Sequence, residues 1–218
     1  MNETVKTALA AWGLEPGPEA IASIETYVSV LKEQNAVQNL VSRNDEPLLW
    51  ERHVLDSLAG AVPLRRLLKP GTAVADAGSG AGFPGLPLAA VLPELRFELL
   101  DSRVRRCDFL RQAAKAMGRS NVTVFNRRVG EGGEAAATRY GAVTERAMGH
   151  LENILPQCLN ILVKGGFFLA WQSAAQLAED RPAVDAAARK AGAALAETFS
   201  YRLPAESDDR HILVFRKG

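Results

Sequence analysis

From residue 71 onward, short apolar runs alternate with helical stretches, and this alternation constrains the fold more than any other feature. The apolar runs have the length of buried strands. Strands are predicted at 73–77, 95–100, 122–125, 140–144, 166–171 and 212–215. Helices are predicted between them at 84–91, 103–117, 151–162 and 174–191. The pattern predicts an α/β fold with helices on both faces of a parallel sheet. No helix follows the last run, which can enter the sheet antiparallel.

The first 70 residues have a different pattern. Apolar residues at helical spacing predict helices at 18–34 and at about 47–58. Pro70 and Gly71 then interrupt the chain. We therefore expect a helical extension over 1–70 and an α/β domain over 71–218, with a ligand at the carboxyl ends of the central strands.

Composition excludes several classes of protein. The chain has 218 residues, of which 47% are hydrophobic and 23% are charged, as in an ordinary globular domain. It has two cysteines without a CxxC pair, three histidines without an HExxH motif, and no apolar run of membrane-spanning length. We expect a monomer in the cytoplasm that needs neither a metal ion nor a membrane.

Charge is unevenly divided along the chain. The first 101 residues carry 8 Lys and Arg against 13 Asp and Glu, and the remainder carries 18 against 12. The helix predicted after residue 102 is strongly basic, and Arg103, Arg105 and Arg106 begin it. A basic half indicates a polyanionic partner such as RNA, although solvated helices often look the same.

A glycine-rich segment joins the first predicted strand to the next helix, with the sequence DAGSGAGFPG at 76–85. A dinucleotide-binding loop would need glycine at Phe83, and a phosphate-binding P-loop would need a lysine that the segment lacks. A nucleophile elbow would need glycines at Ala77 and Ala81. An acidic residue and three alternating glycines remain.

This pattern resembles the first motif of class I S-adenosylmethionine-dependent methyltransferases. There Asp76 would receive the cofactor ammonium, directly or through water, while Gly78 and Gly80 let the backbone lie under the ribose. Asp101 ends the next strand, 23 residues after Gly78, where an acid can accept both ribose hydroxyls. Asp101 can also cap the following helix, and the two roles are compatible.

The sequence after the fourth predicted strand indicates which kind of atom receives the methyl group. It reads TERA at 144–147, without the Asn/Asp-Pro-Pro-aromatic tetrad of exocyclic-amine methyltransferases. Cys158 lies inside a predicted helix, which disfavours cysteine chemistry on a pyrimidine carbon. No general base is evident. Guanine N7 has a free lone pair, so proximity and orientation can suffice for its methylation.

Together these segments resemble the glucose-inhibited division protein B family, bacterial guanine-N7 methyltransferases of small-subunit ribosomal RNA. The matching segments are NLV at 39–41, WERHVLDSL at 50–58, DAGSGAGFPGLPL at 76–88, LDS at 100–102, RR at 105–106, FL at 109–110, RA at 146–147 and, more weakly, RHIL at 210–213. The resemblance implies a class I fold with an N-terminal helical extension, S-adenosylmethionine as cofactor and small-subunit ribosomal RNA as partner. It also implies cofactor contacts at Gly78, Phe83, Asp101, Val129, Gly130 and Arg146.

Two positions depart from the family pattern. Gly130 stands where the family usually has glutamate, and Trp171-Gln172 stands where it usually has Lys-Gly. The second change removes a lysine that would contact RNA phosphate. Trp171 can stack on a base instead, although a tryptophan at a strand end is more often part of the core.

His53 and Asp56 are candidate substrate contacts, because residues three apart share one face of a helix. A carboxylate at Asp56 suits guanine N1 and N2, and it leaves N7 bare. The alternative is a structural ion network of Arg52, His53 and Asp56 that docks the N-terminal helices on the sheet. A methyltransferase of small molecules or proteins, and a catalytically silent RNA-binding assembly factor, remain open as functions.

Overall fold

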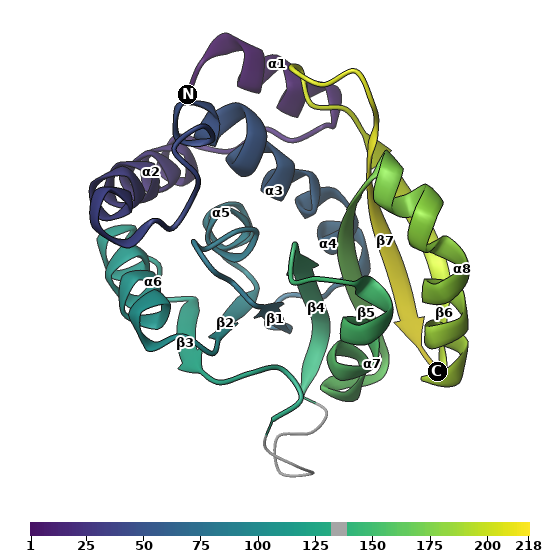
Figure 1. The fold of residues 1–218 in the computed structure, drawn as a ribbon. Helices are drawn as coiled ribbons and strands as arrows, with labels where there is room; N and C mark the ends of the chain where they lie inside the picture. The colour runs from purple at the N-terminus through teal and green to yellow at the C-terminus, as the bar shows by residue number, and fades with distance from the viewer. Residues whose placement is uncertain (132–138) are drawn as a thin grey trace.

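The computed structural model describes residues 1–131 and 139–218, and its centre is a seven-stranded sheet in the order β3-β2-β1-β4-β5-β7-β6 (Figure 1). The strands are β1 (Ala73–Ala77), β2 (Arg96–Asp101), β3 (Val122–Asn126), β4 (Tyr140–Arg146), β5 (Leu162–Ser173), β6 (Ala193–Tyr201) and β7 (Arg210–Lys217). Strands β1 to β5 are parallel, and β7 pairs antiparallel with both β5 and β6. The predicted α/β fold and the antiparallel last strand are confirmed.

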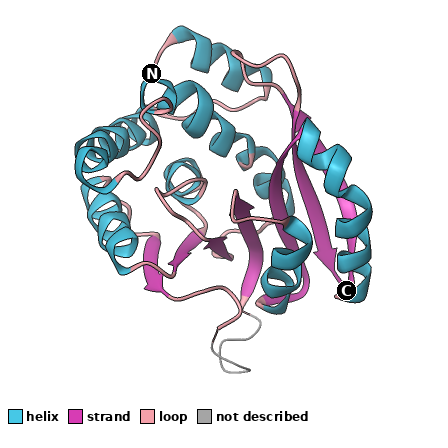
Figure 2. Ribbon diagram, viewed as in Figure 1, coloured by secondary structure: helices cyan, strands magenta, loops and turns pink. Residues whose placement is uncertain are grey.

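Helices cover both faces of the sheet (Figure 2). They are α1 (Glu3–Ala11), α2 (Pro18–Gln38), α3 (Leu55–Ala59), α4 (Ala61–Leu67), α5 (Gly85–Val91), α6 (Val104–Ala116), α7 (Leu151–Asn160) and α8 (Ala174–Lys190). One hydrophobic cluster holds α7 and α8 against the sheet, and the other holds α1 to α6. All five residues of β1 are buried, as a central parallel strand between two layers requires.

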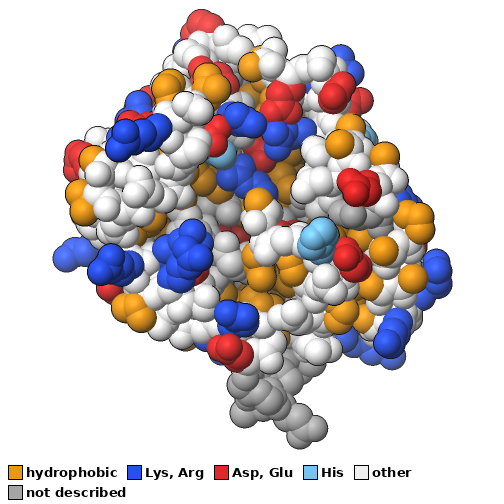
Figure 3. Space-filling model, viewed as in Figure 1, with side chains coloured by type: hydrophobic (Ala, Val, Ile, Leu, Met, Phe, Trp, Pro, Cys, Tyr) orange, Lys and Arg blue, Asp and Glu red, His pale blue; other side chains and the backbone are white. Residues whose placement is uncertain are grey.

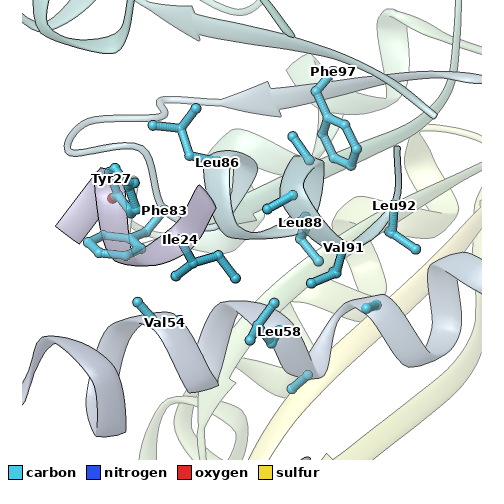
Figure 4. Packing of buried hydrophobic residues seen from close by; sticks show 14 of the residues in the cluster. Ile24, Tyr27, Val54, Leu58, Phe83, Leu86, Leu88, Val91, Leu92 and Phe97 are labelled. Atoms are coloured by element: carbon cyan, nitrogen blue, oxygen red, sulfur yellow. The ribbon is translucent and has the colours of Figure 1, made fainter. Parts of the chain in front are cut away.

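The N-terminal extension shares its core with the α/β part of the chain. Ile24 and Tyr27 of α2 and Leu58 of α3 pack in one cluster with Phe83 and Leu86 (Figure 4). The helices of the first 70 residues therefore form a cover over one face of the sheet, and they bury the segment that follows β1.

The helix expected at 47–58 is composite. It consists of a 3₁₀ turn η1 (Glu46–Leu48), a π-helical turn η2 (Leu49–Val54) and then α3. Apolar spacing cannot distinguish these forms, because a π turn adds only one residue per turn. Single π turns are frequent at functional sites, and η2 carries His53.

The sheet has one strand that the sequence analysis missed. Strand β6 is an edge strand whose exposed and part-buried residues alternate, so it lacks the continuous apolar run of its neighbours. Strand β5 begins at Leu162, four residues before the predicted start, because its pairing with β4 continues past an irregularity near Tyr140. Among the described helices, none is long and apolar enough to cross a membrane.

Candidate functional site

The segment between β1 and α5, residues 78–84, is held from two sides; we call it the glycine loop. Gly78 and Gly82 have φ of 65° and 100°, a backbone region that favours glycine. The Ser79 amide donates to Leu100 O of β2 at 3.1 Å. From the extension, the Tyr27 hydroxyl donates to Ala81 O at 2.6 Å. The glycine loop is thus fixed between the sheet and α2.

Asp76, at the start of this turn, is fully buried. Its carboxyl group accepts from the Gly85 amide at 3.2 Å and from the Thr144 hydroxyl at 2.9 Å. Burial raises the pKa of Asp76 to about 6, against the opposing effect of these hydrogen bonds. Asp76 therefore connects β1, which carries it, to β4 and α5. A cofactor ammonium bound at Asp76, as predicted, would have to donate to carboxyl oxygens that already accept hydrogen bonds from Gly85 and Thr144.

Asp101 connects the glycine loop to the start of α6. Its Oδ2 accepts from the Gly80 amide at 3.0 Å, and its Oδ1 accepts from the Arg103 amide at 2.8 Å. The Arg106 guanidinium lies 3.6 Å from Oδ2. A Cβ added at Gly80 would make ordinary contacts, at 3.7 Å from Arg106 Nη1 and from Gly78 O, so no closer atom encloses this backbone. An acid beside glycine backbone suits a ribose of the kind that S-adenosylmethionine carries.

Val129 and Gly130 follow β3 and approach α7. Val129 is buried, and Gly130 has a φ of 87° with Gln157 of α7 beside it. The next residues, 132–138, lie outside the described part of the chain. The adenine contact at these two residues stays a prediction, and at Gly130 it can involve the backbone alone because glycine has no side chain.

The three basic candidates on α6 differ in their surroundings. Arg103 and Arg105 are exposed, whereas Arg106 is half-buried against Asp101. Arg103 and Arg105 have no ion-pair partner in the described part of the chain, whereas Arg106 faces the predicted ribose contact.

Arg146, at the end of β4, links the glycine loop to the N-terminal cover. Its guanidinium carbon lies 5.0 Å from the centre of the Phe83 ring, and the His53 ring stacks on the same phenyl ring at 5.2 Å. Nη2 of Arg146 is 3.0 Å from His53 Nδ1. Burial, with Arg146 adding to the effect, lowers the pKa of His53 to about 4. His53 is thus neutral at pH 7 and accepts at Nδ1.

Asp56 is fully buried beneath this stack. Arg146 Nη1 donates to its Oδ2 at 2.7 Å, the Tyr201 hydroxyl donates to its Oδ1, and Arg210 Nη1 lies 3.5 Å from the same oxygen. Trp171 Nε1 donates to the Asp56 backbone oxygen at 2.9 Å. These contacts tie α3 to β4, β5, β6 and β7. They favour the docking role of Asp56 over the guanine contact, because both carboxyl oxygens already have donors.

Trp171 is 4% exposed, and its ring lies against Gly60, where an added Cβ would come within 2.5 Å of it. The predicted stacking of Trp171 on an RNA base is therefore wrong for this conformation, and the core alternative holds. A strand-end position is insufficient to indicate exposure when a helix from another part of the chain covers the strand.

A hollow lies at the carboxyl ends of β4 and β5. Figure 3 shows basic, acidic and histidine side chains gathered around a depression near the middle of one face. The hollow is lined by Glu145, Arg146, Ala147, Gly149, Trp171, Gln172, Ser173, Gln176, Tyr201 and Arg210. Glu145 was absent from the sequence candidates, because the strand predicted at 140–144 ends one residue before it, whereas β4 continues to Arg146. No group of His, Cys, Asp and Glu in the described chain is placed to hold a metal ion.

Comparison with known proteins decides the family. The model for GidB, rRNA small subunit methyltransferase G, matches residues 20–211. The chain belongs to this family. Ribosomal RNA small subunit methyltransferase G of Listeria monocytogenes is 32% identical over 217 residues, which is 99% of this chain and 90% of the relative. The protein of the same name from Bacillus subtilis is 32% identical over 219 residues, with the same coverage.

Solved structures confirm the fold of this family member as that of class I methyltransferases. A predicted O-methyltransferase from Agrobacterium tumefaciens superposes with a TM-score of 0.58 at 20% identity, over 75% of this chain and 80% of that one. TYW2 from M. jannaschii, solved in complex with AdoMet, superposes with a TM-score of 0.54 at 14% identity, over 74% of each chain. The family resemblance expected from the sequence is thereby confirmed.

Proposed function

We propose that this protein transfers a methyl group from S-adenosylmethionine to N7 of a guanine in 16S ribosomal RNA of the small ribosomal subunit. The observation that carries the proposal is the hydrogen bond between Asp101 and the backbone of Gly80, in a chain of the rRNA small subunit methyltransferase G family. When bound, the cofactor supplies an electrophilic methyl group on its sulfonium.

The proposed cofactor contacts lie at the ends of successive strands, β1, β2 and β3. Asp101 would hold the ribose hydroxyls, and Gly78 and Gly80 would line the loop beside them. Val129 and Gly130 would contact the adenine through their backbone. The Phe83 ring contacts both the His53 ring and the Arg146 guanidinium. Phe83 therefore lines the site between the glycine loop and β4.

Guanine N7 is the acceptor that suits these side chains. It reacts through a lone pair that carries no proton, so the protein has to orient the base and exclude water. His53 is neutral, and its Nδ1 faces Arg146, while Asp56 is enclosed by donors. Neither residue is needed to remove a proton. We assign His53 a positioning role, in which it holds Phe83 and Arg146 in place.

RNA contacts fall on α6. Arg103 immediately precedes α6 and Arg105 lies in its first turn; both are exposed, next to the end of β2 that carries Asp101. Phosphates bound there would bring an RNA strand past the cofactor site. The proposal includes a monomer that works in the cytoplasm, where ribosomal subunits are assembled, with residues 1–70 as an extension of the methyltransferase domain at 71–218.

Mass spectrometry of ribosomal RNA tests the proposal. In a bacterial strain without the gene, small-subunit RNA should lack one 7-methylguanosine, and the wild-type gene should restore it. RNA that is unchanged in the deletion strain would contradict the proposal, and it would favour the other enzyme substrates or a silent assembly factor. The Asp101→Ala gene is the matched control, because it should fail to restore the modification.

A further inference from the structure

The hollow at the ends of β4 and β5 has a distinctive charge arrangement. Of the described residues that line it, Glu145 alone carries a carboxyl group. The two lining cations, Arg146 and Arg210, both direct a guanidinium nitrogen toward Asp56, at 2.7 and 3.5 Å. Glu145 is therefore the one lining charge that has no ion-pair partner among the described residues.

One of the two carboxyl oxygens of Glu145 accepts a hydrogen bond from the protein. Its Oε1 accepts from the Met148 amide at 2.7 Å, across a turn in which Ala147 has a φ of 59°. Its Oε2 receives no hydrogen bond from the described residues. Oε2 is thus an acceptor without a donor in the described part of the chain, on a residue that lines the hollow and is 2% exposed overall. A buried carboxylate with one free acceptor suits a ligand that brings hydrogen-bond donors.

We propose that the hollow receives the target guanine by its N1 and N2 edge, with Glu145 as the acceptor for those donors. This inference rests on the proposed function. The lining residues belong to β4 and the turn after it, β5, α8, β6 and β7. Of the predicted cofactor contacts, Arg146 lines the hollow with its guanidinium on Asp56, whereas Gly78, Gly80 and Asp101 lie outside it. We therefore assign Glu145 to the base that is methylated.

The chemistry of guanine supports this placement. N1 and the N2 amino group are the donors of guanine, and N7 lies on the opposite side of the ring system. A base held at Glu145 therefore keeps N7 free of hydrogen bonds and at the mouth of the hollow. Methylation leaves a positive charge on the purine, and a carboxylate at its far edge stabilises that charge as it develops.

The protonation of Glu145 predicts a pH dependence of methylation, which is a second test of the proposal. Burial raises its pKa to about 7; Asp76 of β1 adds to the rise, while the Met148 amide and Arg146 oppose it. Cys158 of α7 also faces the carboxyl group, but burial keeps this thiol protonated, with its pKa well above the ordinary value. Only the carboxylate form accepts both guanine donors. Methylation at low RNA concentration should therefore rise from pH 6 to pH 8.

Glu145→Gln tests the proposal in the full-length protein. The amide oxygen of glutamine can still accept from the Met148 amide, so the turn is kept, but the second position becomes a donor that opposes N1 and N2. We expect unchanged affinity for S-adenosylmethionine by calorimetry, methylation of small ribosomal subunits at least tenfold slower, and loss of the pH dependence. Glu152→Gln on α7, outside the hollow, is the control and should match the wild type within twofold.

A base substitution makes the test specific for the guanine edge. Inosine at the mapped target position lacks the N2 amino group but keeps N7. The wild type should methylate this RNA at least tenfold more slowly than the guanosine form, and Glu145→Gln should not distinguish the two. If Glu145→Gln has wild-type activity, Glu145 only holds the turn through the Met148 amide. If Glu145→Gln binds S-adenosylmethionine more weakly, Glu145 is a cofactor contact. Either result overturns the proposal. A wild-type protein that methylates no subunits overturns the proposed function itself.

Discussion

Asp101 shows how one side chain serves both the fold and the site. It binds the backbone of the glycine loop at Gly80 and the backbone of Arg103, so it fixes the two segments on either side of the predicted ribose position. Its carboxylate has lone pairs left for ribose hydroxyls. Local structure and cofactor binding therefore depend on the same residue.

Asp101→Asn should weaken binding of S-adenosylmethionine by at least tenfold. The amide keeps one acceptor for the backbone but loses the charge, and a hydrogen bond to a charged group contributes about 1.5–3 kcal/mol. Isothermal titration calorimetry measures the effect, and circular dichroism should show an unchanged fold. Asp108→Asn, an exposed change on α6, is the control. Equal dissociation constants for Asp101→Asn and the wild type would limit Asp101 to its structural role.

Asp56→Asn should lower the stability of the protein more than its turnover. The change removes the negative charge that Arg146 and Arg210 face, and breaking a buried ion pair costs about 3–5 kcal/mol. Denaturant unfolding should show the loss, while methylation per folded molecule at low temperature stays within a fewfold of the wild type. A variant with normal stability and a tenfold slower reaction would instead support the guanine contact that the sequence suggested for Asp56.

At the scale of elements, α6 presents its basic first turn beside the end of β2. The double variant Arg103→Glu, Arg105→Glu should reduce RNA affinity and leave cofactor affinity unchanged, because both side chains are exposed. Each phosphate contact that is lost should reduce the slope of log affinity against log salt by roughly 0.7–0.9. Filter binding over a salt series measures the slope. Arg189→Glu, Lys190→Glu at the end of α8 is the matched control. An unchanged slope in the α6 variant would make this surface a solvated helix face.

At the scale of the whole molecule, the N-terminal cover and the sheet share one core. Leu31→Ala on α2 should destabilise the entire chain by about 2–5 kcal/mol, as expected for a fully buried leucine. Unfolding followed by near-UV and far-UV circular dichroism should give one coincident transition at lower denaturant. Two separate transitions, with the second one unchanged, would mean that residues 1–70 fold as an independent domain.

Local patterns made much of this architecture predictable. The alternation after Gly71 and the glycine loop are encoded in neighbouring residues, and β1 has the bounds that the sequence indicated. Edge strand β6 lacks that local signal. Its alternating residues pair with β7, which follows it in the chain, and Tyr201 at its end packs against Trp12 from the N-terminal segment.

The environment of Asp56 illustrates what sequence reasoning cannot reach. Its partners Tyr201 and Arg210 lie 145 and 154 residues away, and Tyr201 belongs to the strand that was missed. The free acceptor of Glu145 depends in turn on where β5 and α8 place the wall of the hollow. Such contacts arise from the topology of the sheet and have no signature in the spacing of residues.

The position of the transferred methyl group tests the central claim most directly. The purified protein is incubated with S-adenosylmethionine that carries a labelled methyl group and with small ribosomal subunits from a strain without the gene. The RNA is then treated with a reaction that cleaves at 7-methylguanine. We predict label in small-subunit ribosomal RNA and cleavage at a single guanine. Label at another atom of the RNA, label in ribosomal protein, or no transfer at all would contradict the account.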